Sequence, residues 1–246
     1  MSETRTIRIE VLFPEVACLY GDLFNVKYLA SSIKDSGLEA EVISTSLKDT
    51  PAFVSGDVDM VYMGPMPEYA QELALEVLMP LKERIEELIE AGKVFLFTGN
   101  AFEIFGEYIE RDDGSLIDCL GIYEGHAVRR MMKRYNSLYL GKFGEMDIIG
   151  FKSQFSKTFD VPAENLLFKT VRECEPEDTA RDEGVHIGNF IGTYLLGPFL
   201  IVCPNFTKYI MGLLGIDDPK LTYEEEAMYC YDERMKDFLD PTKDFH

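Results

Sequence analysis

The stretch that most constrains the fold of this 246-residue chain runs from Val94 to Gly106. Its first four residues, Val94 to Phe97, are all apolar, as expected of a strand that is covered on both faces of a sheet. Small residues at Gly99 and Ala101 follow, and a mainly apolar run then leads to Gly106. The pattern predicts a buried strand, a tight turn and then a helix.

Strand-like and helix-like runs alternate through the first hundred residues. We expect strands at 7–13, 41–44, 58–63 and 94–97, and helices at 21–36, 67–77 and 80–91. Pro80 separates the last two helices, because proline suits the first turn of a helix but not its interior. This order predicts an α/β fold with a doubly wound, mainly parallel sheet flanked by helices.

The middle of the chain has a different pattern. Short β-like runs between 107 and 159 surround Asp112-Asp113-Gly114, a hairpin signal, so we expect antiparallel strands added to the main sheet. Residues 185–195 are again strand-like, and helices are expected at 205–214 and at about 222–239. No internal repeat or linker divides the chain, and a single domain over residues 1–246 is expected.

Composition excludes several classes of function. The formal net charge of -20 repels phosphate backbones and anionic lipid, so we expect neither nucleic acid nor membrane as a partner. No run approaches the ~20 apolar residues of a membrane span, and the polar first residues lack the apolar core of a signal peptide, so a cytoplasmic location is expected. Five widely spaced cysteines without a CxxC pair predict reduced thiols and no metal site. No phosphate-binding GxxxxGK[ST] motif occurs, and no cofactor is expected.

Four segments, Leu19–Asn25, Val58–Pro65, Gly99–Gly106 and Gly192–Pro198, carry short motifs in a fixed order. In this order they resemble the class I glutamine amidotransferase domains of the cobyric acid synthase (CobB/CobQ-like) type, a group that includes the glutaminase subunit of lipid II isoglutaminyl synthase. The family patterns are L-Y-G-D-x-x-N, a third strand with a glycine-rich loop, C-G-G-x-Q-x-x-G, and G-T-Y-L-H-G-P. The four segments are their counterparts here, in the same order. Gly150-Phe151-Lys152-Ser153-Gln154 is similar to a fifth pattern, G-F-x-N-H, with its Asn-His pair replaced. The resemblance implies a class I amidotransferase-like, flavodoxin-like fold.

The same resemblance implies that the reacting groups are missing. Gly99 stands where the family has its nucleophilic cysteine, and Leu196 stands where it has its general-base histidine. Glutamine hydrolysis needs a thiolate, a base and N–H donors for the oxyanion. A catalytically impaired homologue is therefore expected, which binds a ligand or serves as a partner subunit. The alternatives are an active amidotransferase that uses unrecognised residues and a scaffold without a ligand.

Several residues are candidate substitutes for the missing groups. A one-residue shift would offer Thr98 as nucleophile, although it would lack a base, and Cys18 or Cys203 would each need an activating neighbour. As a base, His186 would need a sharp reversal of the chain, because ten extended residues span ~33 Å. His126 matches no family motif, and His246 is the last residue and is expected to fray.

We expect this chain to keep a pocket where the family that it resembles has its active site, because ligands of open α/β sheets bind at the carboxyl ends of strands. The absent cysteine is expected to leave extra room, and Glu103, at the family's glutamine position, either binds a ligand at the pocket mouth or stabilises a helix start. Asn100 either keeps the turn or lines the pocket. Tyr20, Asp22 and Asn25 either cap the first helix, which is the expected role, or contact a ligand. The expected ligand is a small amide or amino acid, and the partner implied by the resemblance is a Mur-ligase-like or other amidating synthetase subunit. The pocket residues are Gly64, Gly99, Asn100, Glu103, Tyr194 and Leu196.

Overall fold

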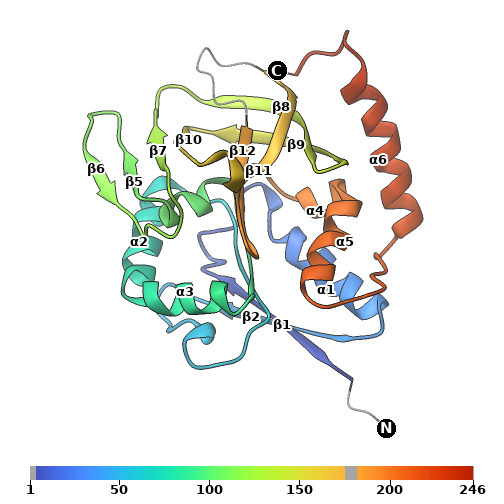
Figure 1. The fold of residues 1–246 in the computed structure, drawn as a ribbon, viewed down its shortest axis with the longest axis horizontal. Coiled ribbons are helices and arrows are strands. Elements are labelled where there is room, and N and C mark those ends of the chain that lie inside the picture. Colours follow the sequence, from blue (N-terminus) through green and yellow to red (C-terminus); the bar gives the residue numbers. More distant parts are fainter. Residues whose placement is uncertain (1–3, 175–181, 246) are drawn as a thin grey trace.

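A nine-stranded sheet runs through the molecule in the order β2-β1-β3-β4-β13-β12-β11-β8-β9 (Figure 1). The computed structural model describes residues 4–174 and 182–245. The first five strands in that order pair in parallel, and the last four continue the sheet by antiparallel pairing. The strands are β1 (Thr6–Leu12), β2 (Glu39–Thr45), β3 (Met60–Met63), β4 (Val94–Thr98), β8 (Tyr135–Phe143), β9 (Met146–Gln154), β11 (Leu166–Glu173), β12 (Asp182–Ile187) and β13 (Phe190–Thr193).

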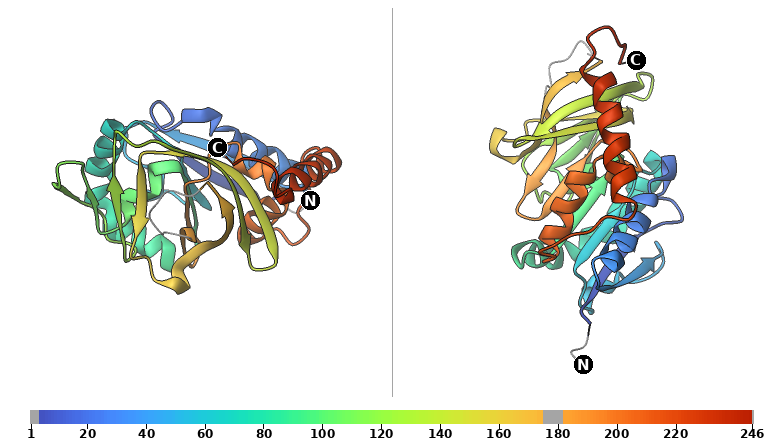
Figure 2. Two further views of the ribbon diagram at one scale, coloured as in Figure 1. Left: turned by 90° about the horizontal axis from the view of Figure 1, so that it is seen from above. Right: turned by 90° about the vertical axis from the view of Figure 1, so that its right-hand side faces the viewer.

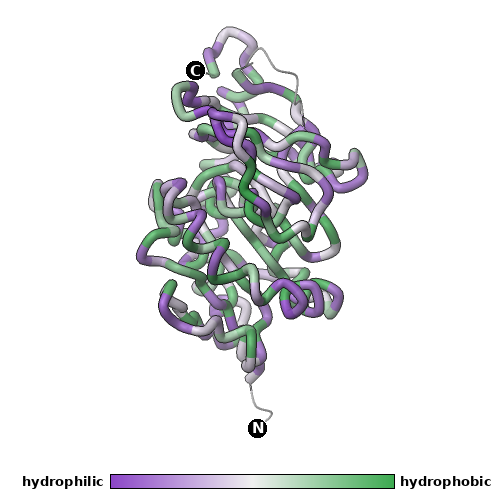
Figure 3. Tube along the Cα trace, turned by 90° about the vertical axis from the view of Figure 1, so that its left-hand side faces the viewer, coloured by the Kyte–Doolittle hydropathy of each residue, from purple (hydrophilic) through white to green (hydrophobic). Residues whose placement is uncertain are grey.

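Helices cover both faces of the parallel half, as predicted. One face packs against α1 (Phe24–Asp35), α4 (Phe199–Val202), α5 (Pro204–Leu213) and α6 (Glu224–Leu239), and the other against α2 (Glu68–Leu78) and α3 (Lys82–Glu90). In β4, Val94 and Leu96 belong to the first apolar cluster, whereas Phe95 and Phe97 belong to the second. Because alternate side chains of a strand point to opposite faces, burial on both sides explains why this strand is apolar without interruption. The hydropathy colouring shows green strands inside the molecule (Figure 3).

Four of the middle strands form a second sheet, a feature that the sequence did not predict. Its order is β10-β7-β5-β6, from β5 (Tyr108–Glu110), β6 (Leu116–Asp118), β7 (His126–Arg129) and β10 (Ser156–Phe159). Of the strands expected between 107 and 159, only β8 and β9 join the main sheet. The hairpin signal is confirmed, since β5 and β6 pair antiparallel around Gly114, which has φ of +79°. Figure 2 shows the antiparallel strands at one end of the molecule, away from the N-terminal strand.

Two local predictions need correction. The run 185–195 contains two strands, β12 and β13, because the chain reverses at Gly188-Asn189. The segment after β4 is a 3-10 helix, η4 (Gly99–Phe105), and not an α-helix. The remaining short 3-10 turns are η1 (Leu19–Gly21), η2 (Ala52–Val54), η3 (Met79–Leu81) and η5 (Ala163–Asn165). Within the described residues, no helix has both the length and the apolar character that crossing a membrane requires.

Candidate functional site

Gly99 begins η4 directly after β4, in the strand-to-helix turn that the sequence predicted. Its φ is +60°, a left-handed conformation that costs a residue with a β-carbon roughly 1–2 kcal/mol. A β-carbon built on Gly99 would lie closer than 3.0 Å to Cβ of Pro65, 3.1 Å from its Cα and 3.3 Å from Cδ2 of Leu196. The expectation that the absent cysteine leaves extra room is therefore wrong, because the loop after β3 fills that space.

Glutamine hydrolysis would need a base and an oxyanion donor beside this turn, and the residues found there are Pro65 and Leu196. Pro65 has no backbone N–H, so this residue of the β3 loop donates nothing to an oxyanion. Leu196 is buried, its backbone N–H donates to the carbonyl of Phe151 at 3.0 Å, and its side chain carries no proton. Of these two neighbours of Gly99, Leu196 therefore supplies no base and Pro65 supplies no N–H donor.

A cavity of about 190 Å³ nevertheless remains beside this turn, and we call it the elbow cavity. Three of the six predicted pocket residues line it, namely Gly99, Asn100 and Leu196. Further lining residues come from the η1 turn, the β3 loop, the start of α2, the turn before β8, the end of β9 and the start of β10: Leu19, Tyr20, Pro65, Met66, Pro67, Glu68, Arg134, Ser153, Gln154, Phe155 and Ser156.

Gly64 is brought to the same end of the sheet but does not line the elbow cavity. It is buried under the chain before η1, where a β-carbon would lie 2.7 Å from the carbonyl oxygen of Ala17 and 2.8 Å from Oδ2 of Asp22. This glycine therefore permits the close packing of two loops.

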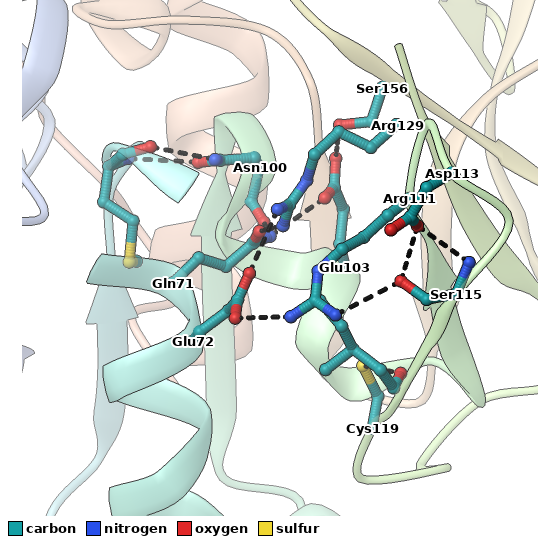
Figure 4. A network of polar contacts seen from close by, with 12 residues as sticks. Gln71, Glu72, Asn100, Glu103, Arg111, Asp113, Ser115, Cys119, Arg129 and Ser156 are labelled. Atoms are coloured by element: carbon teal, nitrogen blue, oxygen red, sulfur yellow. Dashed lines mark hydrogen bonds and ion pairs between the residues drawn. The ribbon is translucent and has the colours of Figure 1, made fainter. Parts of the chain in front are cut away.

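Glu103 and Tyr194 do not line the elbow cavity. Glu103 belongs to a buried network of polar contacts (Figure 4). The Glu103 carboxylate accepts hydrogen bonds from Ser156 Oγ at 2.6 Å, Tyr194 Oη at 2.9 Å and Gln71 Nε2 at 2.9 Å. Glu103 is fully buried, and burial raises its pKa. The hypothesis that it binds a ligand at the pocket mouth is wrong, because its oxygens already bind η4 to β10, α2 and the segment after β13.

Asn100 holds the elbow turn to the loop after β3. Its Oδ1 accepts from the N–H of Met66 at 3.0 Å, and its Nδ2 donates to the carbonyl of Met66 at 2.8 Å. Its own carbonyl accepts from Gln71 at 2.6 Å. Asn100 therefore both keeps the turn and lines the cavity, and its φ, unlike that of Gly99, is not positive.

Asp22 and Asn25 do not cap α1, contrary to the prediction, because the N-cap of this helix is Leu23 and it makes no side-chain hydrogen bond. Asp22 is buried, and its carboxylate accepts from Thr98 Oγ1 at 2.5 Å, from Tyr62 Oη and from Asn25 Nδ2 at 3.3 Å. Burial raises the pKa of Asp22 to about 6 despite these donors. The carboxylate therefore joins the start of α1 to β3 and β4.

Tyr20 is the member of the same motif that reaches the elbow cavity. It is exposed, has φ of +60°, and its hydroxyl accepts from Arg134 at 2.6 Å. Arg134 was not predicted as a site residue, although four cations between 129 and 134 are an unusual feature in a chain of charge -20. Ser153 and Gln154 also line the cavity, and they stand in place of the Asn-His pair in the segment similar to G-F-x-N-H.

The proposed substitutes for the missing groups are not assembled into a second active site. Thr98 does have a carboxylate beside it, yet both Thr98 and Asp22 are fully buried and neither lines the elbow cavity. Cys203 is buried, donates to the carbonyl of Ile149 at 3.0 Å, and burial raises its pKa to about 12, so it remains a thiol. Cys18 is half-buried and does not line the elbow cavity.

The histidines lie away from the elbow. The chain does reverse between His186 and Leu196, but His186 pairs with Ile191 near the start of β13, whereas Leu196 follows its end. His186 contacts Tyr209 Oη at 3.3 Å, and burial lowers its pKa. His126 stacks on the ring of Tyr108 with centroids 4.5 Å apart. His246 lies outside the described residues. Among residues 4–174 and 182–245, no group of three or more His, Cys, Asp or Glu side chains is arranged to hold a metal ion.

Sequence comparison identifies the family. The model of the CobB/CobQ-like glutamine amidotransferase domain matches residues 8–201. The chain belongs to this family. It is 23% identical over 193 residues to the lipid II isoglutaminyl synthase (glutamine-hydrolyzing) subunit GatD of Staphylococcus aureus (strain N315), covering 78% of each chain. It is 26% identical over 200 residues to the corresponding subunit of Streptococcus pneumoniae (strain ATCC BAA-255 / R6), covering 79% of this chain and 75% of that one.

Solved structures support the fold of this CobB/CobQ-like domain. The glutaminase domain of Trypanosoma brucei CTPS with bound acivicin superposes with a TM-score of 0.53 at 9% identity, covering 88% of this chain and 96% of that one. A glutamine amidotransferase superposes with a TM-score of 0.52 at 15% identity, covering 84% and 98%. At these identities the likeness shows the class I glutamine amidotransferase fold alone, which is the fold that the sequence predicted.

Proposed function

We propose that this chain is a catalytically impaired CobB/CobQ-like domain that serves as the binding or partner subunit of an ATP-dependent ligase of the cell-wall or cobyrinate amidation type. The observation that carries the proposal is the steric overlap between Pro65 and any β-carbon at Gly99. A nucleophile at this turn needs a side chain, and the loop after β3 leaves no space for one.

Three separate components of glutamine hydrolysis are missing at the elbow. Gly99 supplies no thiol, Leu196 supplies no base, and Pro65 supplies no N–H donor. Loss of one oxyanion donor alone costs active enzymes about 100- to 1000-fold in rate. Each loss would be severe, and together they support a subunit that has kept the fold but not the reaction.

The subunit role is supported by the relatives. Both GatD proteins are subunits of a lipid II isoglutaminyl synthase, and the matched region covers about three quarters of each. The present chain lacks a GxxxxGK[ST] motif, so it does not supply such an ATP site itself. A Mur-ligase-like or other amidating synthetase would supply the activated carboxylate, and this chain would bind beside it.

The elbow cavity is the proposed ligand site of this domain. It presents the amide of Gln154, the exposed guanidinium of Arg134 and the carboxylate of Glu68. Amide and oppositely charged groups around a small cavity favour a small amide or an amino acid over an apolar ligand.

One contact favours the alternative of an active enzyme with unrecognised residues. Ser156 is the cavity-lining hydroxyl, among the described residues, that donates directly to a carboxylate, with Oγ 2.6 Å from Oε1 of Glu103. A serine beside a carboxylate is one of the arrangements that activate a nucleophile. Against it, Ser156 is buried and the same Glu103 oxygen also accepts from Tyr194.

Ammonia release from glutamine tests both readings. The purified chain is assayed alone and with the product of a neighbouring ligase gene, and an active GatD serves as the positive control. No turnover above buffer is expected. Turnover that Ser156→Ala abolishes would establish the alternative with Ser156 as its nucleophile, and turnover that survives this change would show an active enzyme that uses other residues. The double variant Gly99→Cys with Leu196→His should also be inactive, because Pro65 still occupies the space of the new side chain.

A further inference from the structure

A second cavity, of about 220 Å³, lies among the antiparallel strands beyond the elbow cavity. We call it the wing cavity. Its walls come from β8, β9, β10, β11, β12 and the residue after β13, and these strands lie together at the top of Figure 1. It shares only Arg134 and Gln154 with the elbow cavity, so these two side chains form the partition between them. The described residues that line it are Arg134, Tyr135, Asn136, Ser137, Lys152, Gln154, Lys157, Thr158, Glu173, Cys174, Asp182, Glu183, Gly184 and Tyr194.

Charged residues are buried in the floor of the wing cavity, where they are costly unless they are compensated. Lys152 is nine-tenths buried and forms an ion pair with Glu173, so these two charges neutralise each other. Glu183 is 3% exposed and accepts from Thr193 Oγ1 at 2.9 Å and from the N–H of Tyr194 at 2.6 Å. Within residues 4–174 and 182–245, no cation lies within 4.0 Å of its carboxylate, although the charge of Lys152 acts on it and opposes the effect of burial on its pKa.

Gln154 provides a second observation that points to a ligand. Its Nε2 donates to the carbonyl of Ser156 at 2.7 Å, which fixes the orientation of the amide. Its Oε1 is buried and accepts no hydrogen bond from the described residues. A buried acceptor without a donor costs about 1–3 kcal/mol, so a molecule with an N–H group would gain by binding here.

Arg134 supplies the opposite charge. Its guanidinium donates to Tyr20 Oη and lies over the ring of Phe155, with its Cζ 4.9 Å from the ring centroid, but it pairs with no carboxylate in the described part of the chain. The wall also carries Lys157, whose ammonium lies over the ring of Tyr135, and Asp182, which is exposed and accepts from the N–H of Thr170. The groups that we assign to a ligand are the carboxylate of Glu183, Oε1 of Gln154 and the guanidinium of Arg134. Their complement is a molecule that carries both an ammonium and a carboxylate.

We propose that the wing cavity is a second small-molecule site that binds a free α-amino acid as its zwitterion. The ligand ammonium faces Glu183 and Oε1 of Gln154, and its carboxylate faces Arg134. The volume fits this class, because about 220 Å³ is below the ~300 Å³ at which pockets for drug-sized ligands begin. Burial raises the pKa of Glu183 to about 7, and an ammonium beside it would stabilise its charged form.

Binding of a ligand in the wing cavity would affect the elbow cavity through the backbone and through the side chains that border both. Glu183 holds Thr193 and Tyr194, three and two residues before Leu196, and Gln154 and Arg134 border both cavities. The proposal goes beyond the partner-subunit role and does not depend on the loss of glutaminase activity.

Calorimetric titration of the full chain with the common L-α-amino acids, each at millimolar concentration, tests the proposal. At least one should bind with saturable heat, and its decarboxylated amine and its N-acetyl derivative should each bind about tenfold more weakly or worse, because each lacks one charge. Glu183→Gln and Arg134→Gln should cause similar losses. Glu164→Gln, in an exposed residue that lines neither cavity, should leave the affinity unchanged.

Three results would overturn the proposal. The first is no saturable binding of any amino acid. The second is an amine that binds as tightly as its parent amino acid, which would show that the carboxylate is not recognised. The third is binding that Glu68→Gln weakens and Glu183→Gln does not, which would place the ligand in the elbow cavity. Arg134 is exposed, so its variant still reports on the anionic end if Glu183→Gln fails to fold.

Discussion

Pro65 stands where a side chain on Gly99 would have to lie. Both residues follow neighbouring parallel strands, Pro65 after β3 and Gly99 after β4, and the two strands pair from Met60↔Val94 to Met63↔Phe97. The carboxyl ends of the strands therefore bring the two loops together. In this chain the juxtaposition closes the position that the resemblance assigns to the nucleophile of the family.

Gly99→Ala should lower the free energy of unfolding by about 2 kcal/mol or more, because it combines left-handed strain with steric overlap. Urea denaturation measures this. Gly114→Ala is the matched control, since Gly114 also has positive φ but no atom lies within 4 Å of its built β-carbon. Pro65→Gly should recover part of the loss in the double variant and none of it in the control. Additive effects of Pro65→Gly and Gly99→Ala would show that the two residues do not interact.

Asp22→Asn should change how stability depends on pH. The pKa of Asp22 rises from 3.8 to about 6 on folding, so the folded state binds a proton more tightly than the unfolded state. The contribution of this group is fully present below about pH 4 and is lost as pH rises through about 6. Relative to the Asn variant, the parent chain should therefore lose stability between pH 4 and 7, by roughly 3 kcal/mol at 1.36 kcal/mol per unit.

Unfolding in urea at several pH values measures that difference. Asp113→Asn is the control, because Asp113 is fully exposed and its hydrogen bonds with Ser115 lower its pKa, which gives a dependence of opposite sign. Parallel stability curves for the parent chain and Asp22→Asn would contradict a raised pKa of the buried Asp22 carboxyl.

Glu103→Gln should destabilise the chain despite its nearly identical shape. The three side chains that contact Glu103 all donate to it, and an amide would turn an N–H₂ group toward at least one donor. A buried donor left without an acceptor costs about 1–3 kcal/mol. Thermal unfolding of this variant should show a clear loss, whereas Glu68→Gln should unfold within a degree or two of the parent. A Glu103→Gln protein as stable as the parent would mean that Glu103 is not the acceptor that joins these elements.

The sequence predicted what depends on local pattern and on family motifs. It located the strand-to-helix turn at Gly99 and the doubly wound sheet, because the apolar run of β4 reports burial on both faces. It could not predict the overlap with Pro65, which depends on how two loops far apart in the chain approach each other. Neither could it predict the second sheet, since the alternation of polar and apolar residues in one strand does not show which other strand it pairs with.

The error at Glu103 has a definite geometric cause. An α-helix turns 100° per residue and a 3-10 helix about 120°, so the fourth residue after Gly99 points about 80° away from the expected direction. Glu103 consequently faces β10 and the segment after β13, and not the cavity. Arg134 was missed because it lies in the turn between β7 and β8, outside every family motif.

Asn100→Asp tests how the elbow turn is held, with almost no change of shape. The carboxylate keeps an acceptor for the N–H of Met66 but places a second acceptor against the carbonyl of Met66, where Nδ2 now donates at 2.8 Å. Near pH 7 the variant should be about 1–3 kcal/mol less stable than the parent. Below about pH 4 the deficit should shrink, because a protonated carboxyl donates to that carbonyl as the amide does. Chemical denaturation at pH 7 and at pH 3.5 measures both values.

Asn136→Asp is the control, since Asn136 is exposed and its Oδ1 only accepts a hydrogen bond, from Ser153 at 2.7 Å. A deficit of equal size at both pH values would show that Asn100 acts through packing and not through the bond that it donates.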